Sequence, residues 1–327
     1  MRPTTSLLDR RRFLALGAAC VAAPAVARGA APTNVLDGSA FGTGWRITLP
    51  TGIPTDALRR RAEALIADLD LAFSPWRDDS VLSRFNAGGT PETSVGAEVA
   101  EVTRTALAIA AESNGCFDPT VGPLVARWGF GPITHGATRP GGWRALSADD
   151  RHLRRADATL TLDLCGIAKG YALDRLAALL LDLGQDDVLI DLGGELAARG
   201  RHPSGRVWRV GIEDPRPEVD GLAGRIVLDG VSVATSGIRA NGYDIGGRRY
   251  SHIIDTATRE PVEVALCSVS VVGSSAQEAD AWATALMAAG DDGPALARNR
   301  GIAALFLFRE GGGLRHVATG GIVVDPV

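Results

Sequence analysis

The change from strand to helix is concentrated in one stretch of the sequence, residues 162–174, which read LDLCGIAKGYALD. Asp163 ends a short apolar run and Gly166 supplies a turn. A helix is predicted to begin near Ile167 and to end before Gly184, because leucines recur there at helical spacing. A strand that enters a glycine turn and opens a helix presents backbone N–H groups and the positive helix end to an anion. The stretch therefore predicts a strand, a helix and an anion contact.

Hydrophobic spacing on either side of this stretch predicts further helices and a larger number of short strands. The helices are expected over residues 55–70, with Thr55 as a capping residue, and over 97–113, 167–183 and 276–289. The strands are expected over residues 188–191, 207–212, 224–228, 231–235, 250–254, 267–272, 303–308 and 322–324. Because the strands follow one another in runs, they indicate an α+β fold with antiparallel sheets and packed helices.

The amino-acid composition disfavours several functional classes for this protein. The chain has 327 residues, 46% of them hydrophobic and 22% charged, which is typical of a globular protein with a sizeable core. The net charge is −4 and no basic run outside the N-terminus is long enough to offer a track to phosphates, so a nucleic acid partner is not expected. G-x-G-x-x-G and Walker sequences are absent, and the cysteines show no C-x-x-C spacing, so neither common nucleotide fold nor a zinc site is indicated.

Residues 1–27 have the pattern of an export signal. Arginines at 10–12 precede Phe13 and Leu14, which resembles a twin-arginine signal, and an apolar run then leads to the small residues at 25–27. That run is shorter than the roughly 20 residues needed to span a bilayer. We therefore expect a periplasmic protein whose functional domain covers residues 28–327. Lipid attachment at Cys20 is the alternative, although Gly17 stands where a lipoprotein signal usually has leucine.

Lys169 is the only lysine in the chain, which has 34 Lys and Arg residues together. A composition that otherwise uses arginine favours a specific role for this ammonium group, and we expect it to contact a ligand. The alternative is an ordinary surface lysine.

Asp280 and Thr284 are four residues apart on the predicted helix over 276–289, so their oxygens lie on one face, one turn apart. A carboxylate and a hydroxyl in this arrangement suit Mg²⁺, which takes oxygen ligands. A helix cap and a core threonine are the alternative interpretation.

His252 lies among strand-forming residues, with Asp255 three positions later. A histidine is suited to act as a general base at neutral pH, although one in a strand is often structural. Trp76 and Phe117 are expected either to stack on a flat ring system or to pack in the core.

Together these segments resemble the ApbE family of flavin transferases, which move FMN from FAD onto a threonine of an acceptor protein. The resemblance follows the chain in order through residues 40–43, 80–86, 117–131, 163–174, 191–194, 251–255 and 278–287. It implies a T-fold-like α+β domain that binds FAD as substrate together with Mg²⁺. It also implies an acceptor that is a flavin-carrying subunit of a membrane redox complex.

Carried over by position, the resemblance implies three sets of site residues. The isoalloxazine and ribityl part of FAD would lie near Phe41, Trp76, Cys116, Phe117 and Asp118. Asp163 and Lys169 would contact the nucleotide, and Ile254 would line the pocket. The Mg²⁺ ligands would come from Gly166, Asp280, Ala283 and Thr284, with alanine offering only its backbone oxygen. His252 matches the base of the family, and Asp255 is a second candidate for that role.

One segment departs from the family pattern. The family continues with Pro-x-Thr-Gly after Asp255, whereas this chain has Thr256, Ala257, Thr258 and Arg259. A different loop shape is therefore expected where an acceptor would bind. Two other functions use the same site: hydrolysis of FAD to FMN and AMP, and a non-catalytic role as a periplasmic FAD carrier or maturation accessory of a respiratory complex.

Overall fold

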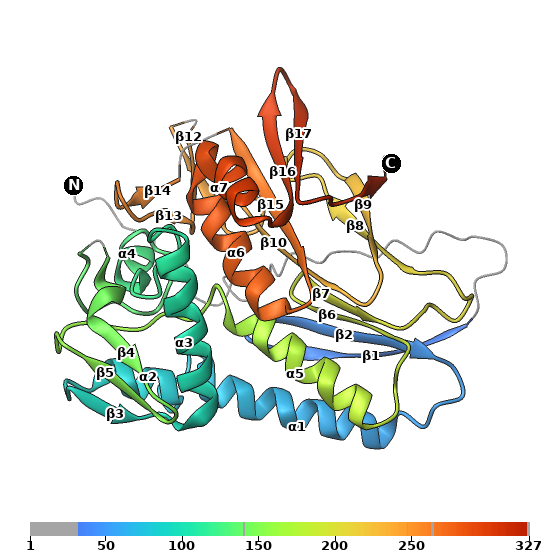
Figure 1. The fold of residues 1–327 in the computed structure, drawn as a ribbon, viewed down its shortest axis with the longest axis horizontal. Coiled ribbons are helices and arrows are strands. Elements are labelled where there is room, and N and C mark those ends of the chain that lie inside the picture. Colours follow the sequence, from blue (N-terminus) through green and yellow to red (C-terminus); the bar gives the residue numbers. More distant parts are fainter. Residues whose placement is uncertain (1–31, 140, 247, 263–264, 326–327) are drawn as a thin grey trace, which may run out of the picture.

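The main sheet of the protein joins strands from both ends of the chain. The computed structural model describes residues 32–139, 141–246, 248–262 and 265–325 (Figure 1). The sheet has eight strands, and every neighbouring pair is antiparallel. In spatial order they are β1 (Thr33–Ala40), β2 (Thr43–Pro50), β6 (Val188–Leu192), β7 (Glu195–Arg199), β10 (Ser232–Gly237), β15 (Leu266–Gly273), β16 (Ala303–Glu310) and β17 (Gly313–Thr319).

Long helices cover one face of this sheet. They are α1 (Asp56–Phe73), α5 (Ala168–Asp182) and α6 (Ala276–Ala288), and α7 (Gly293–Arg300) follows α6 (Figure 1). The main core fills the space between helices and sheet, where Ile47, Leu176 and Leu286 are completely buried. Antiparallel strands covered by packed helices confirm the predicted α+β class.

A second sheet covers part of the opposite face. It contains β18 (Val324–Asp325), β9 (Leu222–Leu228) and β8 (Trp208–Glu213), in that order. Strand β16 shows why two cores form: Phe306 belongs to the main core, whereas Leu305 and Leu307 belong to a second core with Trp208. Successive side chains of a strand point to opposite faces, so this unbroken apolar run is buried on both sides.

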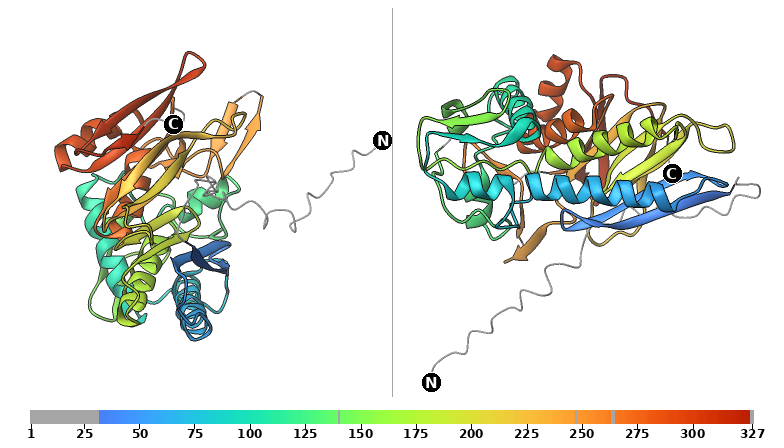
Figure 2. Two further views of the ribbon diagram at one scale, coloured as in Figure 1. Left: turned by 90° about the vertical axis from the view of Figure 1, so that its right-hand side faces the viewer. Right: turned by 90° about the horizontal axis from the view of Figure 1, so that it is seen from below.

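A smaller lobe lies at one end of the molecule (Figures 1 and 2). It contains α2 (Val81–Ala87), α3 (Gly96–Glu112) and α4 (Gly122–Arg127), the 3₁₀ helix η2 (Gly142–Ala145), and a sheet of β3 (Glu92–Ser94), β5 (His152–Arg155) and β4 (Leu146–Ala148). A second 3₁₀ helix, η3 (Gly290–Asp292), precedes α7. The buried Asn86 side chain binds both the N–H and the carbonyl of Leu162, at 2.8 and 2.9 Å, and so attaches the lobe to the stretch that leads into α5.

Two small hairpins flank His252. The first joins β11 (Gly242–Ile245) to β12 (Arg248–Ser251), and the second joins β13 (Ile254–Asp255) to β14 (Glu260–Pro261). The prediction of one strand over 250–254 is therefore wrong. The pairing partner changes from β11 to β14 after Ser251, and the chain leaves the strand conformation at His252 and Ile253.

The predicted helices are confirmed within a few residues, with α1, α3, α5 and α6 in the expected places. Thr55 precedes α1, but its side chain makes no capping hydrogen bond, so its predicted role is wrong. Strand β1 was not predicted because it contains few apolar residues. Strand β2 was missed although its buried Trp45, Ile47 and Leu49 alternate with less buried residues, which is the pattern of a half-buried strand. The predicted export signal at residues 1–27, including Cys20, lies outside the described residues. Among the helices of the described ranges, none is long and apolar enough to cross a membrane.

Candidate functional site

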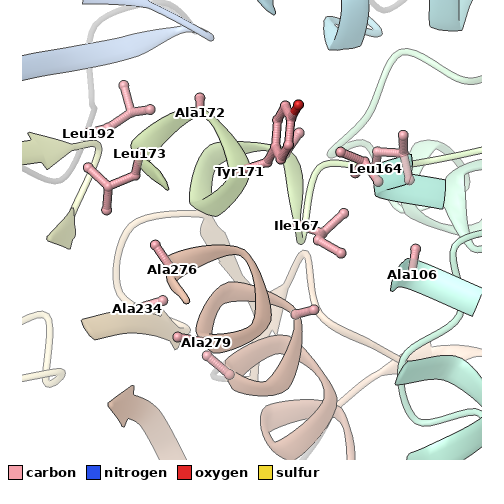
Figure 3. Packing of buried hydrophobic residues seen from close by; sticks show 14 of the residues in the cluster. Ala106, Leu164, Ile167, Tyr171, Ala172, Leu173, Leu192, Ala234, Ala276 and Ala279 are labelled. Atoms are coloured by element: carbon pink, nitrogen blue, oxygen red, sulfur yellow. The ribbon is translucent and has the colours of Figure 1, made fainter. Parts of the chain in front are cut away.

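The first turns of α5 and α6 touch, and this contact creates the site. Asp174 of α5 accepts hydrogen bonds from the N–H groups of Ala276 and Gln277, at 2.9 and 3.0 Å, and from the Ser275 hydroxyl at 3.0 Å. This carboxylate caps the helix that carries Asp280 and Thr284, because the first N–H groups of a helix lack internal partners. Figure 3 shows Ala276 of α6 below the turns of α5.

Gly170 explains how closely the two helices approach. A Cβ atom at this position would lie 2.2 Å from the carbonyl oxygen of Ala276 and 2.8 Å from Cβ of Asp280. Only glycine fits there. Its N–H donates a 3.0 Å hydrogen bond to Oδ2 of Asp280, so the start of α5 fixes the predicted metal ligand on α6.

Lys169, Glu195 and Asp280 form a buried charge cluster. Lys169 Nζ lies 2.5 Å from Oε1 of Glu195 and 3.8 Å from Oδ1 of Asp280, and both carboxylate side chains are only 4% exposed. Burial raises the pKa of Glu195 and of Asp280, although the ammonium opposes this rise. Burial alone would lower the pKa of Lys169, but the two carboxylates outweigh it and raise that pKa, so Lys169 stays charged.

Oxygen atoms suited to a hard cation gather beside this cluster. Thr284 Oγ1 lies 3.3 Å from Ser236 Oγ, and a Cβ on Gly166 would lie 2.9 Å from that same Thr284 oxygen. Ala283 is completely buried in the main core, so only its backbone could contribute. Carboxylate, hydroxyl and carbonyl oxygens are the ligands Mg²⁺ prefers, and Lys169 lies too far from Asp280 Oδ1 to occupy it with a hydrogen bond. Gly166, Asp280 and Thr284, which were predicted together, therefore fit such an ion.

The turn after α3 brings Phe117 to the same place. A Cβ on Gly166 would lie 3.2 Å from the ring of Phe117, which is buried. Asp118 accepts hydrogen bonds from the N–H and hydroxyl of Thr120, at 2.8 and 2.6 Å. Cys116, the preceding residue, is half-buried. The turn is thus held by its own polar side chains and presents Phe117 to the start of α5.

Asp163 lies next to this turn, in the segment between β5 and α5. This segment contains no strand, so the strand predicted to carry Asp163 is wrong. Its N–H donates to the carbonyl of Pro119 at 2.7 Å, and its Oδ1 accepts from the N–H of Cys165 at 2.9 Å. Burial raises the pKa of Asp163 and, likewise, of Asp118. Both predicted nucleotide or flavin contacts therefore also shape the loops on which they lie.

Phe41 and Trp76 lie in different surroundings. Phe41 takes a positive φ of 52° before Gly42 at 71°, in the two-residue turn between β1 and β2, and its ring packs against the main core. Trp76 follows α1 and is 64% exposed. The interpretation of Trp76 as a core residue is therefore wrong, and its contact with a flavin stays a prediction.

His252 is oriented by a backbone carbonyl. Its Nδ1 lies 3.3 Å from the carbonyl oxygen of Asn241, which can only accept, so Nδ1 carries the proton and Nε2 keeps its lone pair. Burial lowers the pKa of His252 to about 4, the Asn241 carbonyl opposes this, and the ammonium of Lys169 adds to the lowering. The ring is neutral at pH 7 and able to accept a proton.

Four aromatic residues, Trp128, Phe130, Tyr243 and Tyr250, form an aromatic stack beside His252. Tyr243 stacks on Phe130 at 5.1 Å and on Tyr250 at 5.5 Å, and Tyr250 stacks on Trp128 at 5.7 Å between ring centres. The Tyr243 hydroxyl donates to the Trp128 carbonyl at 3.1 Å. The edge of Phe130 meets the His252 ring at 6.3 Å. The stack ties the β11–β12 hairpin to the segment after α4.

Asp255 shapes the turn of the second hairpin. Its Oδ1 accepts from the N–H groups of Ala257 and Thr258, at 2.8 and 3.3 Å. Ile254 is buried and pairs with Pro261. The carboxylate of Asp255 therefore holds the loop that departs from the family pattern.

The loop over residues 256–259 is attached to the segment that leads into the Cys116 turn. Thr256 donates its hydroxyl to the carbonyl of Gly115 at 2.7 Å, directly before the Cys116 turn. Arg259 has a φ of 67°, a left-handed conformation that favours glycine, and its guanidinium donates to the Thr138 hydroxyl at 2.6 Å. These two hydrogen bonds fix the shape of the loop.

Sequence reasoning assigned no role to Glu195, Ser236, Asn241 or Asp174. Glu195 begins β7 directly after Gly193 and Gly194, whose positive φ angles of 66° and 102° make the tight turn from β6. The Gly-Gly pair signals a turn, but nothing in the local sequence shows that the next side chain meets Lys169.

Comparison with known proteins gives one consistent result. Residues 41–306 match the model of the ApbE family. The chain is 34% identical over 316 residues to a FAD:protein FMN transferase of Klebsiella pneumoniae (strain 342), covering 90% of each chain. It is 33% identical over 302 residues to the Escherichia coli (strain K12) protein of the same name, covering 86% of each.

Solved structures agree. The Pseudomonas stutzeri flavinyl transferase ApbE, in its apo form, superposes with a TM-score of 0.79 at 36% identity, over 88% of this chain and 95% of that one. The flavin transferase ApbE from Vibrio cholerae gives a TM-score of 0.78 at 30% identity, over 88% and 98%.

Proposed function

Because the chain belongs to the ApbE family, we propose that it is a FAD:protein FMN transferase, which moves FMN from FAD to a threonine hydroxyl of an acceptor protein and releases AMP. The observation that carries this proposal is the meeting of Gly166, Asp280 and Thr284 beside the charged Lys169. This arrangement suits a diphosphate and its cation, and full-length relatives at about a third identity carry the activity in their names.

The diphosphate of FAD is held by positive groups of this chain. The net charge of −4 would repel it, so local cations must bind it. The positive end of α5 adds to them, although its Ala168 and Gly170 N–H groups already donate to the Leu164 carbonyl and to Asp280. Lys169 supplies an ammonium there, and Asp163 contacts the nucleotide. Mg²⁺, held by Asp280, Thr284 and the Gly166 carbonyl, would neutralise the phosphates and the charge that develops on AMP.

The flavin ring lies on the side of the Cys116–Asp118 turn. Phe117 borders the start of α5, and the buried Ile254 comes from the hairpin that Thr256 attaches to this turn. Phe41, whose ring packs against the main core, and the exposed Trp76 would add further apolar contacts to the ring. A flat aromatic ligand binds well between such side chains.

His252 accepts the proton of the acceptor hydroxyl. Its Nε2 has a lone pair, because Nδ1–H is used by the Asn241 carbonyl. The threonine oxygen then bonds to the phosphorus on the FMN side, the bond to the AMP oxygen breaks, and AMP leaves with that electron pair. Asp255 is the weaker candidate base, since its Oδ1 holds the following turn.

The test follows two products at once. The purified protein is incubated with FAD, Mg²⁺ and a threonine-bearing acceptor peptide, while AMP release and intact peptide mass are measured. A mass gain equal to FMN minus water, lost on chelation, supports the transferase. AMP without a modified peptide supports hydrolysis, and tight FAD binding with neither product supports the carrier function.

Asp280→Ala is the decisive variant. It removes the carboxylate oxygens of the cation site, so Mg²⁺-dependent AMP release should fall to background. Asp150→Ala, at a fully exposed carboxylate of the small lobe, is the matched control and should leave release unchanged. Full activity of Asp280→Ala would exclude the assigned cation site.

The place of action is part of the proposal. The pattern of residues 1–27 supports export by the twin-arginine route, a functional domain over 28–327, and an acceptor that is a flavoprotein subunit of a membrane redox complex. Cell fractionation and the N-terminal mass of the exported protein test it. A chain that keeps residue 1 and stays in the cytoplasm would contradict it, and a lipid mass at Cys20 would identify an anchored form.

A further inference from the structure

Lys169 has two buried carboxylates within reach but makes a hydrogen bond with only one. Its Nζ lies 2.5 Å from Glu195 Oε1 and 3.8 Å from Asp280 Oδ1, a distance beyond hydrogen bonding. The lysine side chain is long and flexible, so its position is decided by its partners. The ammonium therefore lies at Glu195 and not at Asp280.

The backbone of Glu195 is fixed by strand pairing, and its side chain is buried. It pairs with Leu192 at the start of β7, directly after the Gly193–Gly194 turn, and is 3% exposed. The opposing carboxylate is equally fixed, because Asp280 Oδ2 accepts from the Gly170 N–H. Only the lysine between them is free to move.

One carboxylate oxygen of Glu195 also destabilises the folded state. Its second oxygen, Oε2, is buried and has no hydrogen-bond partner among the described residues. A buried carboxylate oxygen without a donor destabilises the folded state, so its presence calls for a reason other than stability.

We infer that Glu195 is a positioning residue that keeps the ammonium of Lys169 away from Asp280 and so leaves Asp280 Oδ1 to the divalent cation. The inference rests on the cation site of the proposed function. Without the Glu195 acceptor, Asp280 Oδ1 is the nearest carboxylate oxygen for Lys169 Nζ. An ammonium bonded there would compete with the metal for the same oxygen.

The test is a double-mutant cycle read by metal binding alone. Mn²⁺ affinity is measured by electron paramagnetic resonance on the whole protein without FAD, for the parent, E195Q, K169M and K169M/E195Q. E195Q should weaken binding about tenfold or more. The glutamine oxygen still accepts a hydrogen bond, but it lacks the charge that holds the ammonium, so Lys169 gains a charge-assisted hydrogen bond by moving to Asp280. In the K169M background the same substitution should change the affinity less than about twofold.

The outcomes distinguish the positioning role of Glu195 from the existence of the cation site. Equal weakening by E195Q in both backgrounds would mean that Glu195 acts only through its own charge, and no weakening in either would mean that it has no role at the metal. Both results overturn the inference but keep the cation site. A parent protein that binds no Mn²⁺, with or without FAD, would overturn the cation site and the inference together.

A crystal structure of E195Q gives a second readout that does not depend on K169M folding. Glutamine has the shape of glutamate, so the fold should be retained. The Lys169 Nζ to Asp280 Oδ1 distance should fall from 3.8 Å to the hydrogen-bonding range of about 3 Å. An ammonium that stays beside the substituted side chain at the start of β7 would overturn the inference.

Discussion

The charge cluster and the segment around His252, between the two small hairpins, are two parts of one candidate site, but they are held in different ways. Lys169, Glu195 and Asp280 are enclosed by α5, α6 and β7, where two side chains are only 4% exposed. His252 is partly exposed on a segment held by stacked rings, and Figure 2 shows the orange β11–β12 hairpin projecting from the body of the molecule.

The difference corresponds to two tasks. A small anion and its cation need fixed oxygen and nitrogen atoms, which a packed helix pair provides. A protein acceptor must reach its base from outside, and an exposed hairpin allows that approach. Changes in the cluster should therefore affect binding and stability, whereas changes at the hairpin should affect the transfer step.

His252→Gln should give the largest effect. Loss of a general base lowers the rate of transfer by about 100-fold to 10,000-fold, while FAD and Mn²⁺ affinities stay near those of the parent. Transfer assays and equilibrium binding measure the two quantities. A comparable loss of metal affinity would show that the two regions are not separable.

Gly170→Ala should damage the cluster through packing. The added methyl group would lie 2.2 Å from the Ala276 carbonyl oxygen, so α5 and α6 must separate, at a cost of about 3 kcal/mol in the free energy of unfolding. Gly89→Ala is the control, since nothing lies within 4 Å of its Cβ. Urea unfolding compares them, and equal stability would contradict the close helix contact.

The pH dependence of transfer should report the lowered pKa of His252. In the proposed mechanism the neutral ring is the base, and with a pKa of about 4 it stays neutral down to about pH 5. A histidine at its ordinary pKa would lose about 30-fold in neutral fraction at pH 5. The acid limb of kcat/KM for FAD should thus fall near pH 4, and a midpoint near 6.5 would contradict the described environment.

Tyr243→Ala should lower the transfer rate about tenfold, because Phe130 loses the ring that stacks on it and His252 loses its fixed neighbour. Tyr243→Phe keeps the stack and loses only the hydrogen bond to Trp128, so its rate should stay within about threefold of the parent. Mn²⁺ affinity should not change in either variant. Equal rates for the alanine variant and the parent would show that the stack does not position His252.

Arg259→Gly should give the smallest effect. Glycine relieves the left-handed φ of 67°, and this gain of about 1 kcal/mol offsets the lost hydrogen bond to Thr138. The free energy of unfolding should change by less than about 1 kcal/mol. A loss of more than about 2 kcal/mol would show that the Arg259 side chain is essential to the loop.

Much of the fold was accessible from the sequence. Helices α1, α3, α5 and α6 were predicted because their apolar residues recur at helical spacing, and the α+β class followed from the runs of strands. Strand β1 was not predicted because it has few apolar residues, whereas β2 was missed despite the alternation of its buried Trp45, Ile47 and Leu49. The strand expected over 250–254 is divided at His252.

Several residues of the candidate site could be predicted from the amino-acid sequence alone. Lys169 was singled out by composition, and the pair Asp280 and Thr284 by helical spacing. Their partners became known only from the folded chain: Glu195 beside Lys169, Asn241 behind His252, and the rings of Trp128 and Tyr250 stacked together. These contacts could not be predicted because they join residues that are far apart in the sequence. Periodicity shows which face of one element is buried, whereas these elements meet only when the sheet and its helices have formed.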